Sequence, residues 1–338
     1  MVKFDFYSMS ESGHRLEYIK FSEVELGGSR VFGWDLLKTK RPLLFLMVEE
    51  SFFLYVLVAL IRSLLGRRTV GLIFRGRECV QRSSLRLKVK YWLMRTLKRI
   101  NNIRSISIVP FYVTPKIENI CDDWIYDFQF WDKDFLESLT HKEEVDKAVK
   151  LIEAQAKGRK IICAIGKQDK SKGFDQFLRL YLSSEVLREK YLFVSGGKIN
   201  GIDESLVSKF EGSGGLLINK RISDSELVAL YKVANVIWAC YSPDYDQSSG
   251  VLGRALQYEK AVIVRGESIA EKLSKKYKSP VYSIVESDFS GVLLWLKSEH
   301  GTLRLDGSTS INDKGGNNNL KILLNSLFVN NKNEARSE

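Results

Sequence analysis

The sequence is poor in the residues that hold metal ions. Its 338 residues include only three histidines, which are dispersed, and four cysteines. The cysteines are Cys79, Cys121, Cys163 and Cys240, so no pair has the C-x-x-C spacing of a metal site. The N-terminal stretch does not resemble a signal peptide. These absences predict a chain without a metal site that works in the reducing cytoplasm.

The sequence also lacks an apolar run long enough to cross a membrane. Its most apolar region is 43–65, but Glu49 and Glu50 interrupt it, and the part after them ends at Arg62. A membrane-spanning helix needs roughly 20 consecutive apolar residues. We therefore interpret the region as a strand over Pro42–Val48 followed by a buried helix over Phe52–Leu65.

Acidic residues are nearly absent between 62 and 104. This region holds thirteen lysines and arginines and one acid, Glu78, whereas the whole chain has a formal net charge of +11. The rest of the chain is therefore close to neutral. Within the region, Leu85–Ile100 has the apolar spacing of a helix. The apolar positions on one side are Leu85, Val89, Trp92, Leu93 and Leu97.

Three interpretations of this basic region remain open. A helix with cations around an apolar side is typical of membrane surfaces, so Arg82–Arg104 predicts contact with anionic lipid on the inner face of the cell membrane. A helix packed on a core with a solvated charged side has the same pattern. Nucleic acid would use the same charge, but no nucleic-acid-binding motif is present, so we expect no such partner.

Apolar strand-like runs alternate with helical patterns in the second half of the chain. This alternation predicts a parallel, doubly wound α/β sheet. The predicted strands are Lys160–Ile165, Tyr191–Val194, Leu216–Asn219, Val233–Cys240, Ala261–Val264 and Val281–Ile284.

The chain from 240 to 265 has the pattern of an anion-binding turn. A polar loop, Ser242–Gln247, follows the predicted strand and leads to Ser248, Ser249 and Gly250 at the start of a helix. Serines cap helix N-termini, and glycine lets a ligand approach the backbone. Free N–H groups and the helix dipole favour a phosphate there. An ordinary capped connection between helix and strand is the alternative.

Lysines follow the strand Lys160–Ile165. Lys167 leaves the strand end and Lys172 stands beside the next helix start, so both can bracket one pyrophosphate. The order of residues is not that of a Walker A loop. A second glycine turn, Gly196–Gly197, follows the next strand. The alternative is a solvated lysine-rich turn.

The segment 224–265 resembles the donor-binding core of retaining GT-B glycosyltransferases of family 4, also called group 1. The family's "Asp-x-Glu-Leu" helix is matched by Asp224-Ser225-Glu226-Leu227, and its "Gly-Lys-Pro-Val-Ile" strand by Glu259-Lys260-Ala261-Val262-Ile263. The family's "Gly-Arg-x-x-x-x-Lys-Gly" element is similar to 166–173. Asp246 and Arg254 stand where the family has the two glutamates of its E-x7-E motif, so the second position reverses a charge.

The resemblance implies two Rossmann-like parallel-sheet domains facing a cleft. Their expected bounds are 1–155 and 156–300, followed by a polar linker and terminal helix over 301–338. The implied catalytic residues are Asp246 and His14. The implied donor contacts are Lys167, Lys172, Gly196, Gly197, Gln247, Ser248, Ser249, Gly250 and Arg254. Gly13 and Arg75 are implied on the acceptor or phosphate side.

The resemblance also implies a function. The chain would move a sugar from a nucleotide-sugar donor, with no other cofactor and no metal, to a glycan or lipid-linked glycan acceptor. Synthesis of polysaccharide, lipopolysaccharide or capsule, with retention at the sugar, fits this pattern. The changes at Asp246 and Arg254 leave open an alternative, which is an inactive, membrane-associated binding partner of the same fold.

Overall fold

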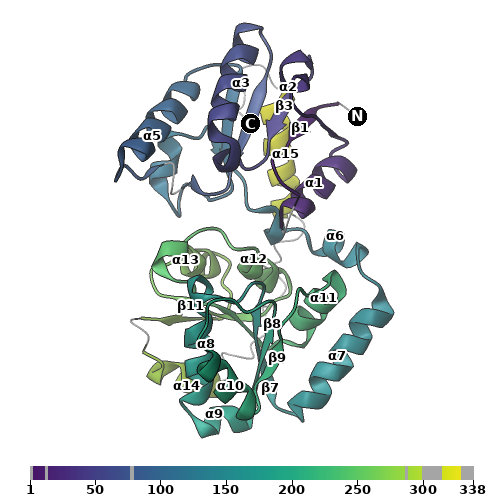
Figure 1. Ribbon diagram of the computed structural model, residues 1–338, viewed down its shortest axis with the longest axis vertical. Coiled ribbons are helices and arrows are strands. Elements are labelled where there is room, and N and C mark those ends of the chain that lie inside the picture. Colours follow the sequence, from purple (N-terminus) through teal and green to yellow (C-terminus); the bar gives the residue numbers. More distant parts are fainter. Residues whose placement is uncertain (1–2, 12–13, 77–79, 286–287, 299–313, 329–338) are drawn as a thin grey trace. The chain divides into compact units, whose positions relative to one another are not determined.

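The computed structural model describes the chain except residues 1–2, 12–13, 77–79, 286–287, 299–313 and 329–338. The chain forms two compact units, each built on a six-stranded parallel sheet (Figure 1). The first unit is Met1–Asp127 with Lys314–Glu338, and the second is Phe128–Asp313. The predicted pair of Rossmann-like α/β domains is confirmed.

The first unit has the strand order β2-β1-β3-β4-β5-β6. Its strands are β1 (Asp5–Tyr7), β2 (Ser29–Arg30), β3 (Leu43–Phe45), β4 (Thr69–Ile73), β5 (Ile103–Ser107) and β6 (Asp123–Trp124). Its helices include α1 (His14–Val24), α2 (Asp35–Lys38), η1 (Val48–Ser51), α3 (Phe52–Leu64), α5 (Leu85–Leu97), η2 (Pro115–Asn119) and α15 (Lys314–Phe328). Strands β3, β4 and β5 are buried along their whole length, which explains their apolar runs.

The second unit has the strand order β12-β11-β10-β7-β8-β9. Its strands are β7 (Lys160–Ile165), β8 (Tyr191–Gly196), β9 (Leu216–Ile218), β10 (Val236–Ala239), β11 (Ala261–Arg265) and β12 (Val281–Ile284). Its helices are η3 (Phe128–Phe130), α6 (Lys133–Ser138), α7 (Lys142–Ala156), η4 (Lys170–Lys172), α8 (Phe174–Leu182), α9 (Glu185–Lys190), α10 (Glu204–Gly212), α11 (Asp224–Val233), η5 (Pro243–Tyr245), α12 (Gly250–Gln257), α13 (Ile269–Lys276) and α14 (Ser290–Lys297). All six predicted strands are present within a few residues of their expected bounds.

The division between the units lies at 127/128 rather than near 155. The segment after Asp127 belongs to the second unit because its side chains pack there. Leu136 and Val145 form a buried cluster with Val228 and Ala229 of α11. The predicted terminal helix is present as α15 and belongs to the first unit, where the Asn319 Oδ1 atom accepts the backbone N–H of Tyr126 at 3.1 Å.

The predicted helix after β3 is present but is not buried all round. Tyr55 and Arg62 of α3 are fully buried, whereas Phe53 and Leu57 on its outer side are more than half exposed. The side of α5 that packs inward also differs from the prediction, because Tyr91 and Met94 are buried and Trp92 is exposed. No helix in the described part of the chain is long and apolar enough to cross a bilayer.

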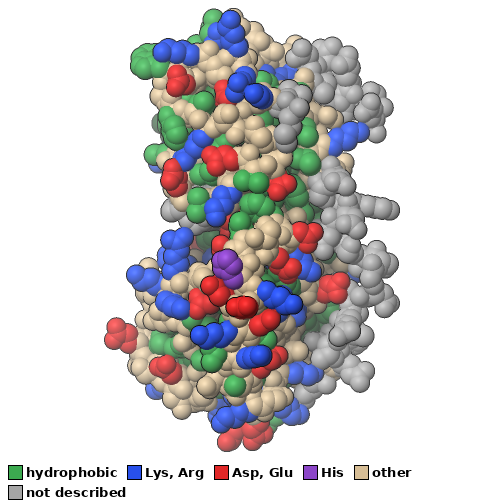
Figure 2. Space-filling view, turned by 90° about the vertical axis from the view of Figure 1, so that its right-hand side faces the viewer, with side chains coloured by type: hydrophobic (Ala, Val, Ile, Leu, Met, Phe, Trp, Pro, Cys, Tyr) green, Lys and Arg blue, Asp and Glu red, His purple; other side chains and the backbone are tan. Residues whose placement is uncertain are grey.

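The basic region does not present all of its charge to solvent. Arg62, Arg68, Lys90 and Arg104 are buried, so the accessible charge is smaller than the sequence count indicates. Figure 2 shows one face of the molecule, on which the described Lys and Arg side chains are interspersed with Asp and Glu.

Candidate functional site

The order of strands in the second sheet defines where a ligand would bind. Strands β7 and β10 are neighbours, and the chain leaves them toward opposite edges of the sheet, through β8 in one direction and β11 in the other. In open α/β sheets, ligands bind outside the carboxyl ends of the strands at such a reversal. The loops that follow β7 and β10 are the lysine-rich loop and the Ser-Ser-Gly loop of the sequence analysis. The fold therefore brings these two predicted elements together.

The two loops are in direct contact. The N–H of Ser242 donates to the carbonyl of Ser171 at 2.9 Å. Gly173 has a φ of +65°, and a Cβ atom on it would lie 2.0 Å from the carbonyl oxygen of Cys240. Only glycine fits this close approach without backbone movement.

Lys172 is held in a fixed position between these loops. Its Nζ atom lies 4.3 Å from the ring centre of Tyr241 and 4.2 Å from that of Tyr245. Burial lowers the pKa of Lys172, but Tyr241, Tyr245 and Asp169 outweigh this effect, so the pKa lies above its ordinary value. The result is an ordered cation at the carboxyl edge of the sheet, since aromatic faces attract ammonium groups.

Asp169 organises the turn that carries both lysines. Its carboxylate caps η4 by accepting the N–H of Lys172, accepts the Ser171 hydroxyl, and pairs with Lys167 Nζ at 2.9 Å. Burial raises the pKa of Asp169, but these bonds lower it below its ordinary value. Lys167 itself is largely exposed, so its ion pair with Asp169 is weak enough to exchange for a ligand.

The glycine turn after β8 lies beside the lysine-rich loop. Gly197 has a φ of +142°, and a Cβ atom on it would lie 1.8 Å from the carbonyl oxygen of Gly166. Gly196 accepts the Gly166 N–H at 2.9 Å. Two buried polar atoms at this place, Gln168 Nε2 and Ser195 Oγ, have no hydrogen-bond partner among the described residues. Such atoms in folded proteins usually have water or a ligand as a partner.

The N-terminus of α12 follows the second loop, as the sequence predicts. Ser249 is its N-cap: the hydroxyl accepts the Leu252 N–H and is 2.6 Å from the Tyr241 hydroxyl. Gln129 covers part of this turn, because a Cβ atom on Gly250 would meet the end of that flexible side chain. Gln247 and Ser248, which precede the helix, are partly exposed.

Asp246 is anchored to the next helix. Its Oδ1 accepts the Ile269 N–H at the start of α13 at 2.9 Å, and its Oδ2 is 3.4 Å from Arg265 Nη2. Its side chain remains 16% exposed. Asp246 is therefore a positioned carboxylate at the loop's end, with part of its surface accessible.

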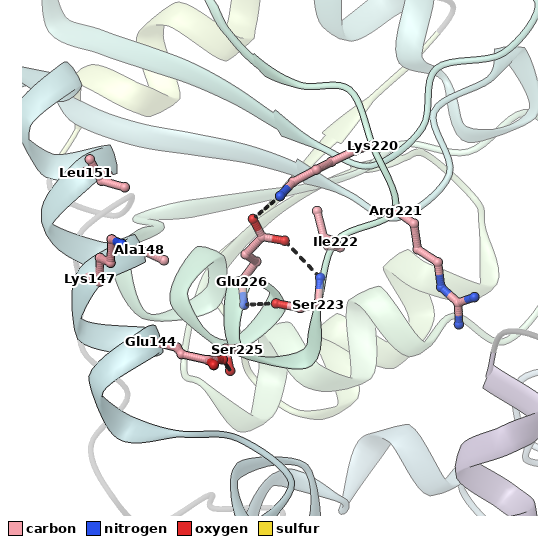
Figure 3. A pocket seen from close by; sticks show the side chains of 10 residues that line it. All are labelled: Glu144, Lys147, Ala148, Leu151, Lys220, Arg221, Ile222, Ser223, Ser225 and Glu226. Atoms are coloured by element: carbon pink, nitrogen blue, oxygen red, sulfur yellow. Dashed lines mark hydrogen bonds and ion pairs between the residues drawn. The ribbon is translucent and has the colours of Figure 1, made fainter.

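A separate hollow of about 540 Å³ lies between α7 and the start of α11 (Figure 3). Two of its charged groups bind one another, since Lys220 Nζ is 2.7 Å from Glu226 Oε1, and a third, Glu144, accepts the hydroxyl of Ser225. Glu226 also closes the capping box of α11 with Ser223. None of the residues predicted for the site lines this hollow.

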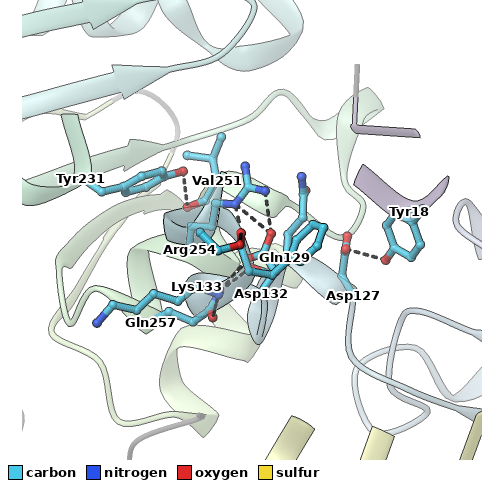
Figure 4. Close-up of polar contacts among 11 residues, drawn as sticks. Tyr18, Asp127, Gln129, Asp132, Lys133, Tyr231, Val251, Arg254 and Gln257 are labelled. Carbon is cyan, nitrogen blue, oxygen red and sulfur yellow. Dashed lines mark hydrogen bonds and ion pairs between the residues drawn. The ribbon is translucent and has the colours of Figure 1, made fainter. Parts of the chain in front are cut away.

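Arg254 has a buried partner that the sequence did not predict. Its guanidinium is buried and pairs with Asp132, with Nη2 2.6 Å from Oδ2 (Figure 4). Gln257, one turn further along α12, donates to the same carboxylate and to the backbone of Gln129. The reversed charge is explained by this partner, because a glutamate at 254 would face Asp132. Arg254 thus joins α12 to the η3–α6 segment, and its contact with a donor phosphate stays a prediction.

The three candidates in the first unit are less defined. Gly13 lies outside the described residues, and His14 is the first residue of α1, with no side-chain position described. Arg75 is exposed just after β4, and its backbone N–H donates to Glu49 of η1. Arg75 and Glu49 thus lie at the carboxyl edge of the first sheet.

Four residues at or near this site are not predicted from the sequence, namely Gln168, Tyr241, Tyr245 and Asp132. The first three lie within loops that the sequence analysis singled out, but aromatic and amide side chains in a polar loop carry no signal of their own. Asp132 stands 122 residues from its partner Arg254. The sequence gives one indirect indication of this partner, which is an arginine at position 254 where the resembling family has an acid.

The sequence matches no protein-family profile and no curated protein. Solved structures do resemble it. Anabaena Alr3699/HepE in complex with UDP and glucose has a TM-score of 0.64 at 11% identity, covering 96% of this chain and 99% of that one. WaaG, a glycosyltransferase involved in lipopolysaccharide biosynthesis, has a TM-score of 0.53 at 12% identity, covering 90% and 91%.

A UDP-forming α,α-trehalose-phosphate synthase from Burkholderia xenovorans is also similar, with a TM-score of 0.52 at 15% identity and coverage of 88% and 72%. At these identities the likeness concerns the fold. The chain has the two-domain Rossmann-like α/β fold of these proteins.

Proposed function

We propose that this chain is a glycosyltransferase that binds a nucleotide-sugar donor at the carboxyl edge of the second sheet. The observation that carries the proposal is the fixed position of the Lys172 ammonium group, which lies over the rings of Tyr241 and Tyr245. This group is at the carboxyl ends of β7 and β10, beside the N-terminus of α12. A fixed cation and free helix N–H groups together favour a diphosphate. A structure of similar fold was crystallised with UDP and glucose, which supports the same ligand class here.

The proposed roles of the remaining residues follow from their positions. Lys167 exchanges its pair with Asp169 for the diphosphate, while Gly196, Gly197 and Gln168 line the turn beside it. Cations and N–H groups stabilise the leaving diphosphate without a metal or other cofactor.

Asp246 orients the sugar, and Gln247, Ser248, Ser249 and Gly250 contact the sugar or phosphate. The backbone of the last three supplies N–H donors. Gly13, His14 and Arg75 are proposed on the acceptor or phosphate side.

The acceptor and cellular setting are part of the proposal. We propose transfer with retention to a glycan or lipid-linked glycan in polysaccharide, lipopolysaccharide or capsule synthesis. The protein would work in the cytoplasm, attached to the inner face of the cell membrane through the basic region Arg82–Arg104. The exposed cations on α5 favour this attachment.

A screen of donors tests the proposal. The full chain is heated with UDP-, GDP-, CMP- and dTDP-sugars, and one nucleotide class should raise the melting temperature. A ligand at about 100 times its Kd stabilises the folded state by about 2.7 kcal/mol. No shift with any nucleotide sugar would contradict the proposed donor.

A second function is favoured by the buried pair of Arg254 and Asp132. In the resembling family, the acid at position 254 contacts the donor, and here a structural arginine replaces it. A binding partner without turnover would keep the fold and the site. Incubation of the stabilising donor with an acceptor extract separates the two functions, since only an enzyme releases free nucleotide and labels the acceptor.

A further inference from the structure

The outer side of α3 is apolar and exposed along its whole length. Phe53, Leu57, Leu60 and Leu64 follow one another at helical spacing, with 58%, 57%, 37% and 88% of their surfaces exposed. A surface helix of a globular protein normally carries polar residues on this side. Here the outward stripe is hydrophobic instead, and contiguous exposed apolar patches mark interaction sites.

The one charged side chain of α3 does not lie on this surface. Arg62 points inward and is fully buried, where it donates to the carbonyls of Leu36, Thr39, Arg41 and Arg68. The apolar stripe is therefore not interrupted by charge. Its length of 13 residues corresponds to roughly 20 Å of helix, which is too short to cross a bilayer core of about 30 Å.

Helix α5 extends the surface and adds charge to it. Strands β3, β4 and β5 are consecutive neighbours, so right-handed crossovers place α3 and α5 on the same face of the sheet. The two helices lie side by side (Figure 1). The Nζ atom of Lys90 on α5 lies 5.3 Å from the ring centre of Phe52 on α3. The outward side of α5 carries exposed apolar residues, Leu85, Val89 and Trp92.

The charge carried by the two helices themselves has one sign. Arg82, Arg86 and Lys88 are exposed, and neither α3 nor α5 contains an acidic residue. The face in Figure 2, by contrast, mixes both signs. An apolar stripe beside cations without acids complements an anionic lipid surface, which offers acyl chains next to phosphate headgroups. A protein partner would need an apolar strip opposite α3 and acidic residues opposite the cations of α5.

We propose that α3 and α5 form a membrane-docking surface in which α3 is the inserting element. The stripe Phe53, Leu57, Leu60 and Leu64 enters the boundary between headgroups and acyl chains, while the cations of α5 lie among the headgroups. This inference rests on the membrane attachment proposed above. It adds burial of apolar side chains to the electrostatic attraction as a source of binding free energy. Attachment by charge alone is screened by salt, whereas burial of the α3 stripe is not.

Vesicle sedimentation at two salt concentrations tests the proposal. The full chain is mixed with phosphatidylcholine vesicles, with or without phosphatidylglycerol, at low salt and at about 0.5 M salt, where charges are screened. The variant Phe53→Ser/Leu57→Ser/Leu64→Ser should lose salt-resistant binding by about tenfold or more, because three large apolar groups no longer enter the bilayer. The variant Arg82→Gln/Arg86→Gln/Lys88→Gln should lose mainly the low-salt gain on anionic vesicles.

A matched variant controls for the loss of exposed apolar residues in general. Leu151, Val186 and Leu294 are exposed in the second unit, and their joint replacement by Ser should leave vesicle binding unchanged. Melting temperatures of all variants show whether each folds.

Unchanged salt-resistant binding by the folded α3 variant overturns the proposal. So does a dimer of the wild type that the α3 variant abolishes while its vesicle binding persists, because a second copy would then cover the stripe. Donor-induced stabilisation, measured on the same variants, reports separately on the proposed glycosyl transfer.

Discussion

Replacement of Asp132 by Ala should destabilise the second unit by about 3–5 kcal/mol, because it leaves a buried arginine without its counter-charge. The Arg254 guanidinium contacts both oxygens of this carboxylate, and Asp132 is only 1% exposed. Solvent cannot replace the lost partner. The loss should appear in urea denaturation, with hydrogen exchange of peptides from each unit showing that the second unit is affected.

The double variant Asp132→Leu/Arg254→Met is the matched control. It removes both charges at once, and apolar replacements of a buried pair are often neutral or stabilising. We expect it to recover most of the stability lost in Asp132→Ala. Arg254→Glu, which restores the family residue, should unfold the unit further by facing Asp132 with a second carboxylate. A stable, folded Arg254→Glu variant would contradict the structural role assigned to Arg254.

Replacement of Arg62 by Met should destabilise the first unit by more than about 4 kcal/mol, since buried acceptors left without a donor cost about 1–3 kcal/mol each. The guanidinium donates to four backbone carbonyls and to the Thr69 hydroxyl. Burial lowers the pKa of Arg62 to about 10, so it stays charged at neutral pH.

Arg99→Met, at an exposed position of the same unit, is the control and should change stability by less than about 0.5 kcal/mol. Denaturation midpoints of the two variants check this. An equal, small effect of both replacements would show that the Arg62 bonds contribute little to the fold.

The α/β architecture is predictable from the sequence because its strands are buried on both faces. Runs such as Ile161–Ile165 and Val262–Val264 are apolar throughout, which is the pattern of central parallel strands. A two-residue edge strand lacks this signal, whereas the longer edge strands β9 and β12 carry enough of it to be predicted. Strand β2 has two residues, Ser29 and Arg30, and neither is buried. It is recognisable as a strand only from its parallel pairing with β1.

The candidate site is predictable in part, for a related reason. The turn residues Lys172, Ser249 and Gly250 belong to local patterns, and the rule for parallel sheets places the ends of β7 and β10 together. The contacts of Lys172 with Tyr241 and Tyr245, and the pairing of Arg254 with Asp132, join segments that are distant in the chain. Spacing along the chain does not encode them.

The prediction that α3 is a buried helix is wrong for its outward side, for a different reason. A run such as Phe52–Leu60 gives the same apolar pattern whether a helix is enclosed on all sides or has one exposed side. Its place in the outer layer of the sheet, which tertiary structure decides, is what distinguishes the two.

Calorimetric titration of UDP and of uridine into wild type and Lys172→Ala tests the central claim most directly. Loss of one charge-assisted contact should weaken UDP binding by about 1.5–3 kcal/mol, or roughly 10- to 150-fold. Uridine, which has no phosphate, should bind both proteins equally. Lys172→Arg should retain part of the UDP affinity. If the folded Lys172→Ala protein binds UDP as wild type does, or loses uridine and UDP affinity in equal measure, Lys172 does not hold the diphosphate and the site lies elsewhere.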